Sequence, residues 1–326
     1  MTLNIKLSIK MFSEKLSEIV RFLMLVPFIW LSIPKLVILS NYPQIFNQRQ
    51  QMSQVDVELC VFYQCISSTN GGGIYCSQNT ISASITMTTF LECTSESNGG
   101  GFYIICSLFV IQKTCFSRCF SRNGIAFYSS ALSSLQMNES SFDSNSGDGS
   151  YLWYSYKGGV RVSLLNSTDN HCVLGSHGGT IECTSVTIWL MCNFMNSIMV
   201  TATCFERPIS SGFSRINLIN NTSSGGLFYL RSAHSYIFDN FVFVNNIGAA
   251  FRSTSAVGST IVFKNSLSNH SITGASYSRT NTSFNVQISD FGIILVNNSC
   301  FRIFPTYQHR GFRATNFFLL FIFLIF

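Results

Sequence analysis

The chain has 326 residues, of which 47% are hydrophobic and only 10% are charged. Typical soluble domains carry about 25% charged residues, and here 49 Ser, 22 Thr and 26 Asn provide the polar surface instead. The net charge of +6 comes from basic residues near the two ends with no basic stripe between them, so the composition argues against a nucleic-acid partner and favours a secreted or surface β-protein.

Residues 1–40 are predicted to form a signal peptide or signal anchor. Residues 22–33 (FLMLVPFIWLSI) follow a mostly basic region and have about the length of the hydrophobic part of a secretory signal. They are short for a membrane-spanning helix, which needs about 20 residues, and Pro27 and Pro34 interrupt the apolar stretch. The alternative is a buried apolar segment that caps the fold. Residues 41–59 are expected to form an N-terminal cap or linker.

The sequence repeats from residue 60 onward. Residues 60–75 (CVFYQCISSTNGGGIY) align with residues 88–103 (TTFLECTSESNGGGFY), and residues 114–128 and 140–154 are the next copies. Each copy contains Phe-x-x-Cys or Phe-x-x-Asn, a polar stretch, a glycine-rich corner, and an apolar residue followed by an aromatic one. Weaker copies occupy residues 220–230, 243–251 and 262–277, the last of which contains Phe263.

The segments between the glycines predict strands. Residues 81–90 and 214–221 place apolar side chains at every second position, which is the period of a β-strand. A repeat of roughly 22–28 residues suffices for two or three short strands with their corners. The sequence therefore predicts an all-β fold, a right-handed parallel β-helix (a pectate-lyase-like solenoid) of about nine or ten coils over residues 60–301.

Stacked coils explain the repeated glycines, because a sharp corner needs left-handed backbone angles and leaves no room for a side chain against the next coil. The predicted corner glycines are Gly71, Gly72, Gly73, Gly99, Gly100, Gly101, Gly124, Gly225, Gly226, Gly248 and Gly274. Two columns are predicted to face the core, one of Phe62, Phe90, Phe116 and Phe142 and one of Cys65, Cys93, Cys119 and Asn145. The 12 cysteines are expected to be mostly buried thiols, and their disulfide state stays open.

The glycine-aromatic corner followed by Phe-x-x-Asn, as in residues 142–145 (FDSN) and 243–246 (FVNN), resembles the repeats of chlamydial polymorphic outer-membrane proteins. It is also similar to the related Pmp-like surface proteins of trichomonads. The resemblance covers roughly residues 60–301, and the early copies depart from it by having Phe-x-x-Cys. It implies a right-handed parallel β-helix displayed at a surface, with adhesion as the expected role, and it brings no catalytic residue.

Candidates for carbohydrate-active chemistry are weak. Residues 166–170 (NSTDN) and 176–179 (SHGG) resemble pieces of polygalacturonase motifs, but glycoside hydrolysis needs convergent carboxylates and only Asp148 and Glu182 lie near them in sequence. The acidic residues form no column that would bind calcium. No catalytic, metal-binding or cofactor-binding residue is predicted. The alternative to a non-enzymatic protein is a degenerate carbohydrate-active β-helix enzyme of the polysaccharide lyase or glycoside hydrolase class.

Other surface features concern glycans. Seven sequons are candidate glycosylation sites if the chain is secreted: Asn138, Asn166, Asn220, Asn221, Asn269, Asn281 and Asn297. Trp153, Tyr154 and Tyr156 could form a carbohydrate platform, although such a cluster more often fills the core.

Residues 302–316 are expected to form a basic linker and residues 317–326 (FFLLFIFLIF) an apolar tail. As a helix the tail would rise about 15 Å, half of a hydrocarbon core, so a truncated membrane segment, a lipid-anchor signal or an edge strand all fit, as does a fragment of a longer protein. The predicted function is adhesion or display by a non-enzymatic, membrane-associated surface or secreted protein without a cofactor, whose partner is an extracellular or host glycan or protein.

Overall fold

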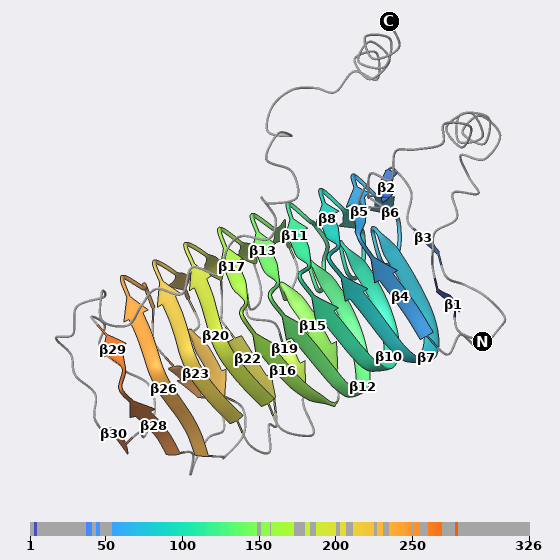
Figure 1. Ribbon diagram of the computed structural model, residues 1–326. Helices are drawn as coiled ribbons and strands as arrows, with labels where there is room; N and C mark the ends of the chain where they lie inside the picture. The colour runs from blue at the N-terminus through green and yellow to red at the C-terminus, as the bar shows by residue number, and fades with distance from the viewer. Residues whose placement is uncertain are drawn as a thin grey trace, which may run out of the picture.

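The protein folds as a parallel β-helix, as the sequence predicts (Figure 1). The computed structural model describes residues 3–4, 37–40, 44–45, 54–148, 151–156, 158–172, 180–182, 187–199, 203–206, 211–224, 227–230, 235–248, 251–253, 260–268 and 278–279. All regular elements among these residues are β-strands. Successive coils lie side by side, so that the colour passes steadily along the solenoid from blue to orange (Figure 1).

Long strands form the first face of the solenoid. They are β4 (Gln54–Glu58), β7 (Ile74–Thr86), β10 (Phe102–Gln112), β12 (Phe127–Asn138), β16 (Gly159–Ser163), β20 (Thr187–Met195), β23 (Ser211–Ile219), β26 (Ser235–Val244), β28 (Thr260–Lys264) and β30 (Ser278–Arg279). Their side chains alternate: in β4, Val55 and Val57 are buried while Glu58 is exposed. This alternation is the period-two pattern expected of strands with one face on the core.

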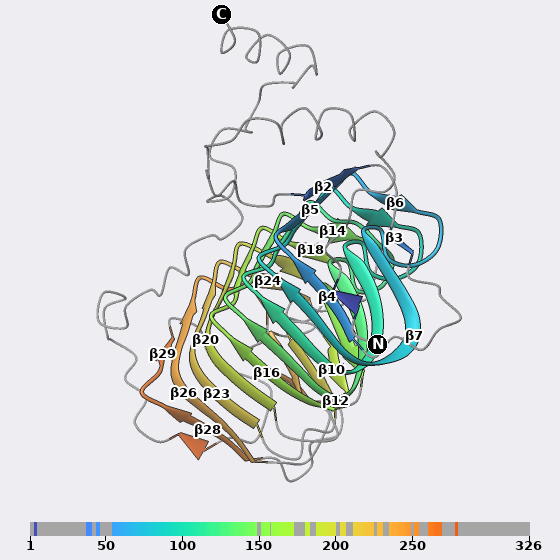
Figure 2. The ribbon, with the colours of Figure 1, turned by 45° about the vertical axis from the view of Figure 1, so that its right-hand side comes forward.

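Short strands continue each coil past a corner. They are β2 (Val37–Ser40), β5 (Cys60–Tyr63), β8 (Thr89–Leu91), β11 (Cys115–Ser117), β13 (Ser141–Asp143), β17 (Asn166–Thr168) and β29 (Leu267–Ser268), together with the C-terminal parts of β20, β23 and β26. After a second corner come two-residue strands on the upper side of Figure 2. These are β6 (Ile66–Ser67), β9 (Thr94–Ser95), β14 (Ser146–Gly147), β18 (His171–Cys172), β21 (Ile198–Met199) and β24 (Thr222–Ser223).

The remaining strands close the coil. The N-terminal parts of β7, β10 and β12 align with β3 (Gln44–Ile45), β15 (Trp153–Tyr156), β19 (Thr180–Glu182), β22 (Thr203–Glu206), β25 (Phe228–Leu230) and β27 (Phe251–Ser253). Within the segment predicted as a signal, β1 (Leu3–Asn4) pairs with β4 and β2 pairs with β5.

The register of the coils is continuous along the chain. The position of Phe62 is paired in turn with Phe90, Phe116, Phe142, Ser167, Phe194, Leu218, Phe243 and Ser268. From Phe62 onward the chain returns to this position after 28 residues at the longest, from Phe62 to Phe90, and 24 at the shortest, from Phe194 to Leu218. The sequence placed Phe263 in the weaker copies of this repeat, but Phe263 pairs with Phe238 on the first face instead. Residues 280–301, the end of the predicted β-helix, lie outside the described residues.

Two corners of each coil are built without glycine, in addition to the one glycine corner per coil that the sequence predicts. At the first corner the left-handed residues are Leu59, Met87, Lys113, Glu139, Leu164, Met191, Arg215, Asn240 and Asn265, with φ between 47° and 55°. At the second they are Gln64, Glu92, Arg118, Ser144, Asp169, Asn196, Asn220 and Asn245, with φ between 51° and 55°. A left-handed non-glycine residue costs of order 1 kcal/mol, but residues at both corners donate a backbone bond to the next coil, as in Met87 N–H to Gln112 O and Glu92 N–H to Ser117 O, both at 2.9 Å. The side chains at these corners also pair between coils, as Arg118 does with Glu92 at 2.9 Å.

Glycine is required at a third corner and for the reasons predicted. Gly71, Gly99 and Gly124 have φ of 67°, 71° and 56°. A Cβ on Gly72 would lie 2.1 Å from the carbonyl oxygen of Gly100 in the next coil, and one on Gly73 would lie 2.8 Å from that of Gly101. Close approach of two backbones therefore explains the glycine triplets, whose third member also lies against the ring of Phe90.

Gly248 does not belong to this corner. It follows Ile247, which pairs with Thr222, so Gly248 lies beside Ser223 in the column of the two-residue strands. Gly225, Gly226 and Gly274 lie outside the described residues.

We predict that Gly72→Ala destabilises the protein by about 3 kcal/mol or more, because the new methyl group overlaps backbone atoms that cannot move without displacing a coil. The matched control is Gly212→Ala on β23, where no atom lies within 4 Å of a new Cβ and the residue is exposed. That substitution should stabilise by about 0.5–1 kcal/mol, because alanine loses less backbone entropy. Denaturant unfolding of both variants measures the difference, and equal effects would contradict the stacking described.

Candidate functional site

The first predicted column is a stack of phenylalanine rings in the core. The ring centroids of Phe62, Phe90, Phe116 and Phe142 are 4.8, 5.1 and 5.0 Å apart with interplanar angles of 5–6°. All four side chains are at most 1% exposed. The column contributes to stability through buried area and aromatic contact, and no ligand can reach it.

The second predicted column contains a hydrogen-bond ladder in which cysteine and asparagine play the same part. The Sγ of Cys93 donates to the carbonyl of Phe62 at 3.3 Å, and the Sγ of Cys119 donates to that of Phe90 at 3.6 Å. In the next coil, Asn145 Nδ2 donates to the carbonyl of Phe116 at 3.0 Å. The amide is the stronger donor, because a thiol donates only weakly, and its oxygen also accepts the N–H of Cys119 at 2.8 Å.

The ladder continues through residues that the sequence analysis did not assign to it. Asn170, Asn221 and Asn246 donate to the carbonyls of Phe142, Phe194 and Leu218 at 3.1, 2.8 and 2.8 Å. Between them Ser197 donates to Met195 O instead. Each of these residues lies three positions after a residue of the phenylalanine column, so the spacing of the Phe-x-x-Asn motif is kept. Two copies were not recognised in the sequence because Ser167 and Leu218 replace the phenylalanine.

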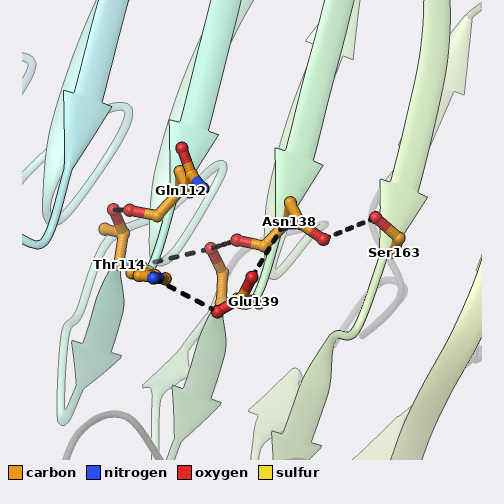
Figure 3. Close-up of polar contacts among 7 residues, drawn as sticks. Gln112, Thr114, Asn138, Glu139 and Ser163 are labelled. Atoms are coloured by element: carbon orange, nitrogen blue, oxygen red, sulfur yellow. Dashed lines mark hydrogen bonds and ion pairs between the residues drawn. The ribbon is translucent and has the colours of Figure 1, made fainter.

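A second set of polar contacts lies at the first corner (Figure 3). The hydroxyls of Thr114 and Ser140 donate to the carbonyls of Gln112 and Asn138, both at 3.1 Å. Ser163 Oγ donates to Asn138 Oδ1 at 2.7 Å, and Asn138 Nδ2 donates to Glu139 at 3.2 Å. Lys113 pairs with Glu139 at 3.7 Å. The Ser163–Asn138 bond and the Lys113–Glu139 pair connect one coil to the next, and the other bonds stabilise the corner within its own coil.

The sequons differ in their access to solvent. Asn166 and Asn221 are 4% and 0% exposed, and Asn221 uses its amide in the ladder. Asn138 is half-buried and hydrogen-bonded, whereas Asn220 is exposed at the second corner. Asn269, Asn281 and Asn297 lie outside the described residues. A glycan on Asn220 is therefore compatible with the folded β-helix, and one on Asn221 is not.

The cysteines are mostly buried thiols, as expected from the sequence. Cys60, Cys65, Cys76, Cys93, Cys106, Cys119, Cys172 and Cys192 are free and buried, and Cys115 is disulfide-bonded. Burial raises the pKa of Cys106 and of Cys192 to about 12 and that of Cys60 to about 11. Because the thiolate is the reactive form, these residues are chemically inert at neutral pH.

The acidic and histidine side chains that the structure describes form no cluster of three or more metal-binding groups. Asp143 accepts hydrogen bonds from Ser117 at 3.4 Å and from Thr168 at 3.1 Å, and Asp169 is an exposed corner residue. His177 lies outside the described residues. In the described part of the chain no group of three or more His, Cys, Asp or Glu side chains could hold a metal ion.

A row of four tyrosines lies on the outside of the coil. We call Tyr75, Tyr103, Tyr128 and Tyr154 the tyrosine row, because they are paired in register on β7, β10, β12 and β15. Their ring centroids are 5.5, 5.1 and 4.8 Å apart with interplanar angles of 26°, 10° and 19°. All four side chains are half-buried.

The alternation of the strands explains why the row faces outward. Each tyrosine follows a buried residue, Ile74, Phe102, Phe127 or Trp153, whose side chain lies in the core. Trp153, proposed from the sequence as part of a carbohydrate platform, is 0% exposed, whereas its neighbour Tyr154 belongs to the row and the side chain of Tyr156 is outside the described set. The repeated apolar-aromatic pair in the sequence was the signal for this row.

The described residues two positions after Tyr103 and Tyr128 on their strands, Ile105 and Ser130, are uncharged. A Cβ on Gly71 would lie 3.1 Å from the Cα of Tyr75, so the glycine corner folds back against the row. The preceding asparagines form a parallel line, with Asn98 Nδ2 donating to Asn70 Oδ1 at 2.8 Å. Burial, and then the neighbouring Tyr75, raise the pKa of Tyr103. That hydroxyl therefore keeps its proton well into the alkaline range and can donate a hydrogen bond.

Comparisons of the chain with protein-family models, curated proteins and solved structures find no significant match. The resemblance to Pmp-like repeats thus stays a prediction. Among the described residues, no helix has the length and apolar character needed to cross a membrane.

We predict that Asn145→Ala lowers the free energy of unfolding by about 2–4 kcal/mol, since it leaves Phe116 O and the N–H of Cys119 without their partner inside the core. The control is Gln136→Ala, an exposed amide side chain on β12, which should change stability by less than about 0.5 kcal/mol. Denaturant unfolding measures both. A loss below that limit for Asn145→Ala would show that the ladder does not stabilise the fold.

We predict that the buried thiols do not react with a disulfide reagent at pH 8 until the protein unfolds. Because the folded pKa of Cys192 is about 12 and its ordinary value is 9.0, its contribution to stability is complete below pH about 9 and is lost as pH rises toward 12. Mass-spectrometric mapping should find Cys60, with a pKa of about 11, labelled first as pH is raised. Labelling of Cys192 in the folded protein at pH 8 would refute the prediction.

Proposed function

We propose that this protein is a non-enzymatic, surface-displayed or secreted β-helix that binds a partner through its exposed faces. The observation that carries the proposal is the tyrosine row, a half-buried line of identical aromatic residues stacked on the outside of four successive coils. Hydrophobic burial explains the inward columns, but outward tyrosines in four successive coils are not needed for the core. Exposed aromatic side chains are typical of binding surfaces.

The low content of charged residues supports a place outside the cytosol, as do the repeats that resemble Pmp-like surface proteins. Membrane association, through one of the apolar terminal segments, is part of the same proposal. The enzymatic alternative gains no support from the described residues, because Asp143 and Asp169 meet no second catalytic group.

Surface display is tested by protease treatment of intact cells that produce a tagged copy of the full chain. We expect the protease to remove the tag from the central region, while a cytosolic marker stays intact. Protection of the tag on intact cells, with cleavage after lysis, would refute surface display.

The binding role is tested with a variant in which all four residues of the tyrosine row are changed to Phe. The rings and their stacking stay, but four hydroxyls are lost, each worth about 0.5–1.5 kcal/mol, so binding of the purified protein to intact cells should fall at least about tenfold. The control is Tyr63→Phe, a half-buried tyrosine on β5 outside the row. Unchanged binding by the fourfold variant, or release of reducing ends from pectin by the wild type, would contradict the proposal.

A further inference from the structure

We propose that the tyrosine row binds a neutral, linear polysaccharide that runs along the axis of the β-helix. This inference rests on the proposed function and names the class of ligand. It depends on four properties of the row: how its rings are oriented, how they are spaced, the charge around them, and the pairing of the strands that carry them.

The rings of the row present their edges to the ligand. Their faces are covered by one another, since the interplanar angles are 10–26° at centroid distances of 4.8–5.5 Å. A single sugar ring that stacks on an aromatic residue needs a free face, and even at the Tyr154 end of the row the ring of Tyr151 lies 5.3 Å from that of Tyr154, at an interplanar angle of 35°. Recognition along the row therefore uses the phenol hydroxyls, which both donate and accept hydrogen bonds, as do the hydroxyls of a sugar.

The spacing selects a ligand with a repeat. Equivalent hydroxyls recur once per coil, at about the 4.8 Å strand separation, and the asparagine line of Asn70, Asn98 and Asn123 runs beside them with the same period. A polymer that offers one set of hydroxyls at a similar interval contacts several coils at once. After the first contact each further one is intramolecular, which raises the affinity of the polymer. A compact ligand would engage only one or two of the tyrosines.

The charge of the surroundings selects a neutral polymer. Ile105 and Ser130 on the strands of the row and the three asparagines carry no charge, although the exposed Arg122 precedes Asn123 in the chain. A polyanion such as an acidic glycan or a nucleic acid requires cationic partners for its carboxylates or phosphates. Those uncharged residues offer none.

The strand pairing argues against an extended peptide. Peptides bind sheets by adding a strand to a free edge, but β10 is paired with β7 on one side and β12 on the other, and β12 continues to β15. The backbone of the strands beneath the row is therefore already hydrogen-bonded to neighbouring strands. Only side chains are offered to the ligand, which fits a polyhydroxylated chain better than a polypeptide.

The test uses the full chain with linear oligosaccharides of two to six residues from neutral glucans, mannans and chitin, and with polygalacturonate as the acidic probe. By calorimetry, one neutral series should bind with an affinity that rises with length and levels off at about four residues, one per tyrosine. The variant with all four residues of the row changed to Phe should bind at least about tenfold more weakly at an unchanged melting temperature, and Tyr63→Phe should bind like the wild type.

Each other outcome overturns the inference. Binding of polygalacturonate alone, affinity independent of length, or no neutral polymer bound at all would refute a neutral linear ligand. If the protein still binds cells through the tyrosine row after periodate destroys their glycans, and protease treatment of those cells abolishes binding, the partner is a protein: the proposed function then survives and this inference fails. If cell binding never depends on the row, both fail together.

Discussion

The structure depends on the in-register stacking of each coil on the next. Parallel backbone hydrogen bonds fix this register, and even the left-handed corner residues maintain them, as Leu59 does with Thr86. Every side chain consequently meets its own equivalents above and below, about 4.8 Å away. Inside the coil this condition produces the phenylalanine stack and the carbonyl ladder. Outside the coil the same condition produces the tyrosine row, so core and candidate binding surface follow from one constraint.

The stacking also explains how much could be predicted from the sequence. The fold and the first columns were predictable because Phe62, Phe90 and Phe116 recur in recognisable copies. The two corners made by residues such as Lys113 at the first and Arg118 at the second were not predictable, because nothing in their chemistry marks a left-handed conformation and only the bonds to neighbouring coils maintain it. Gly248 was assigned to the wrong corner for a related reason. A glycine in the sequence indicates that space is restricted, but it does not show which column of the solenoid the residue occupies.

The candidate site was only partly visible for similar reasons. The sequence drew attention to Trp153 and Tyr154 as one cluster, whereas strand alternation sends the first into the core and the second to the surface. The tyrosines of four coils are 25–28 residues apart in the chain and become neighbours only through the register. A surface built in this way has the period of the backbone rather than the shape of a pocket, which favours long, repetitive partners over small ones.

The ion pairs at the corners point to the origin of the low charge content. Lys113 lies over Glu139 and Arg118 over Glu92, so at these two corners the charged residues of adjacent coils have opposite signs. If such a solenoid lengthens by duplication of a coil, any charged side chain is placed directly against its own copy, and like charges about 4–5 Å apart repel by a few kcal/mol near a protein surface. Serine, threonine and asparagine suffer no such penalty and can even bond to their copies, as Asn98 does to Asn70. Growth by internal duplication would thus favour uncharged polar residues in the columns of the solenoid.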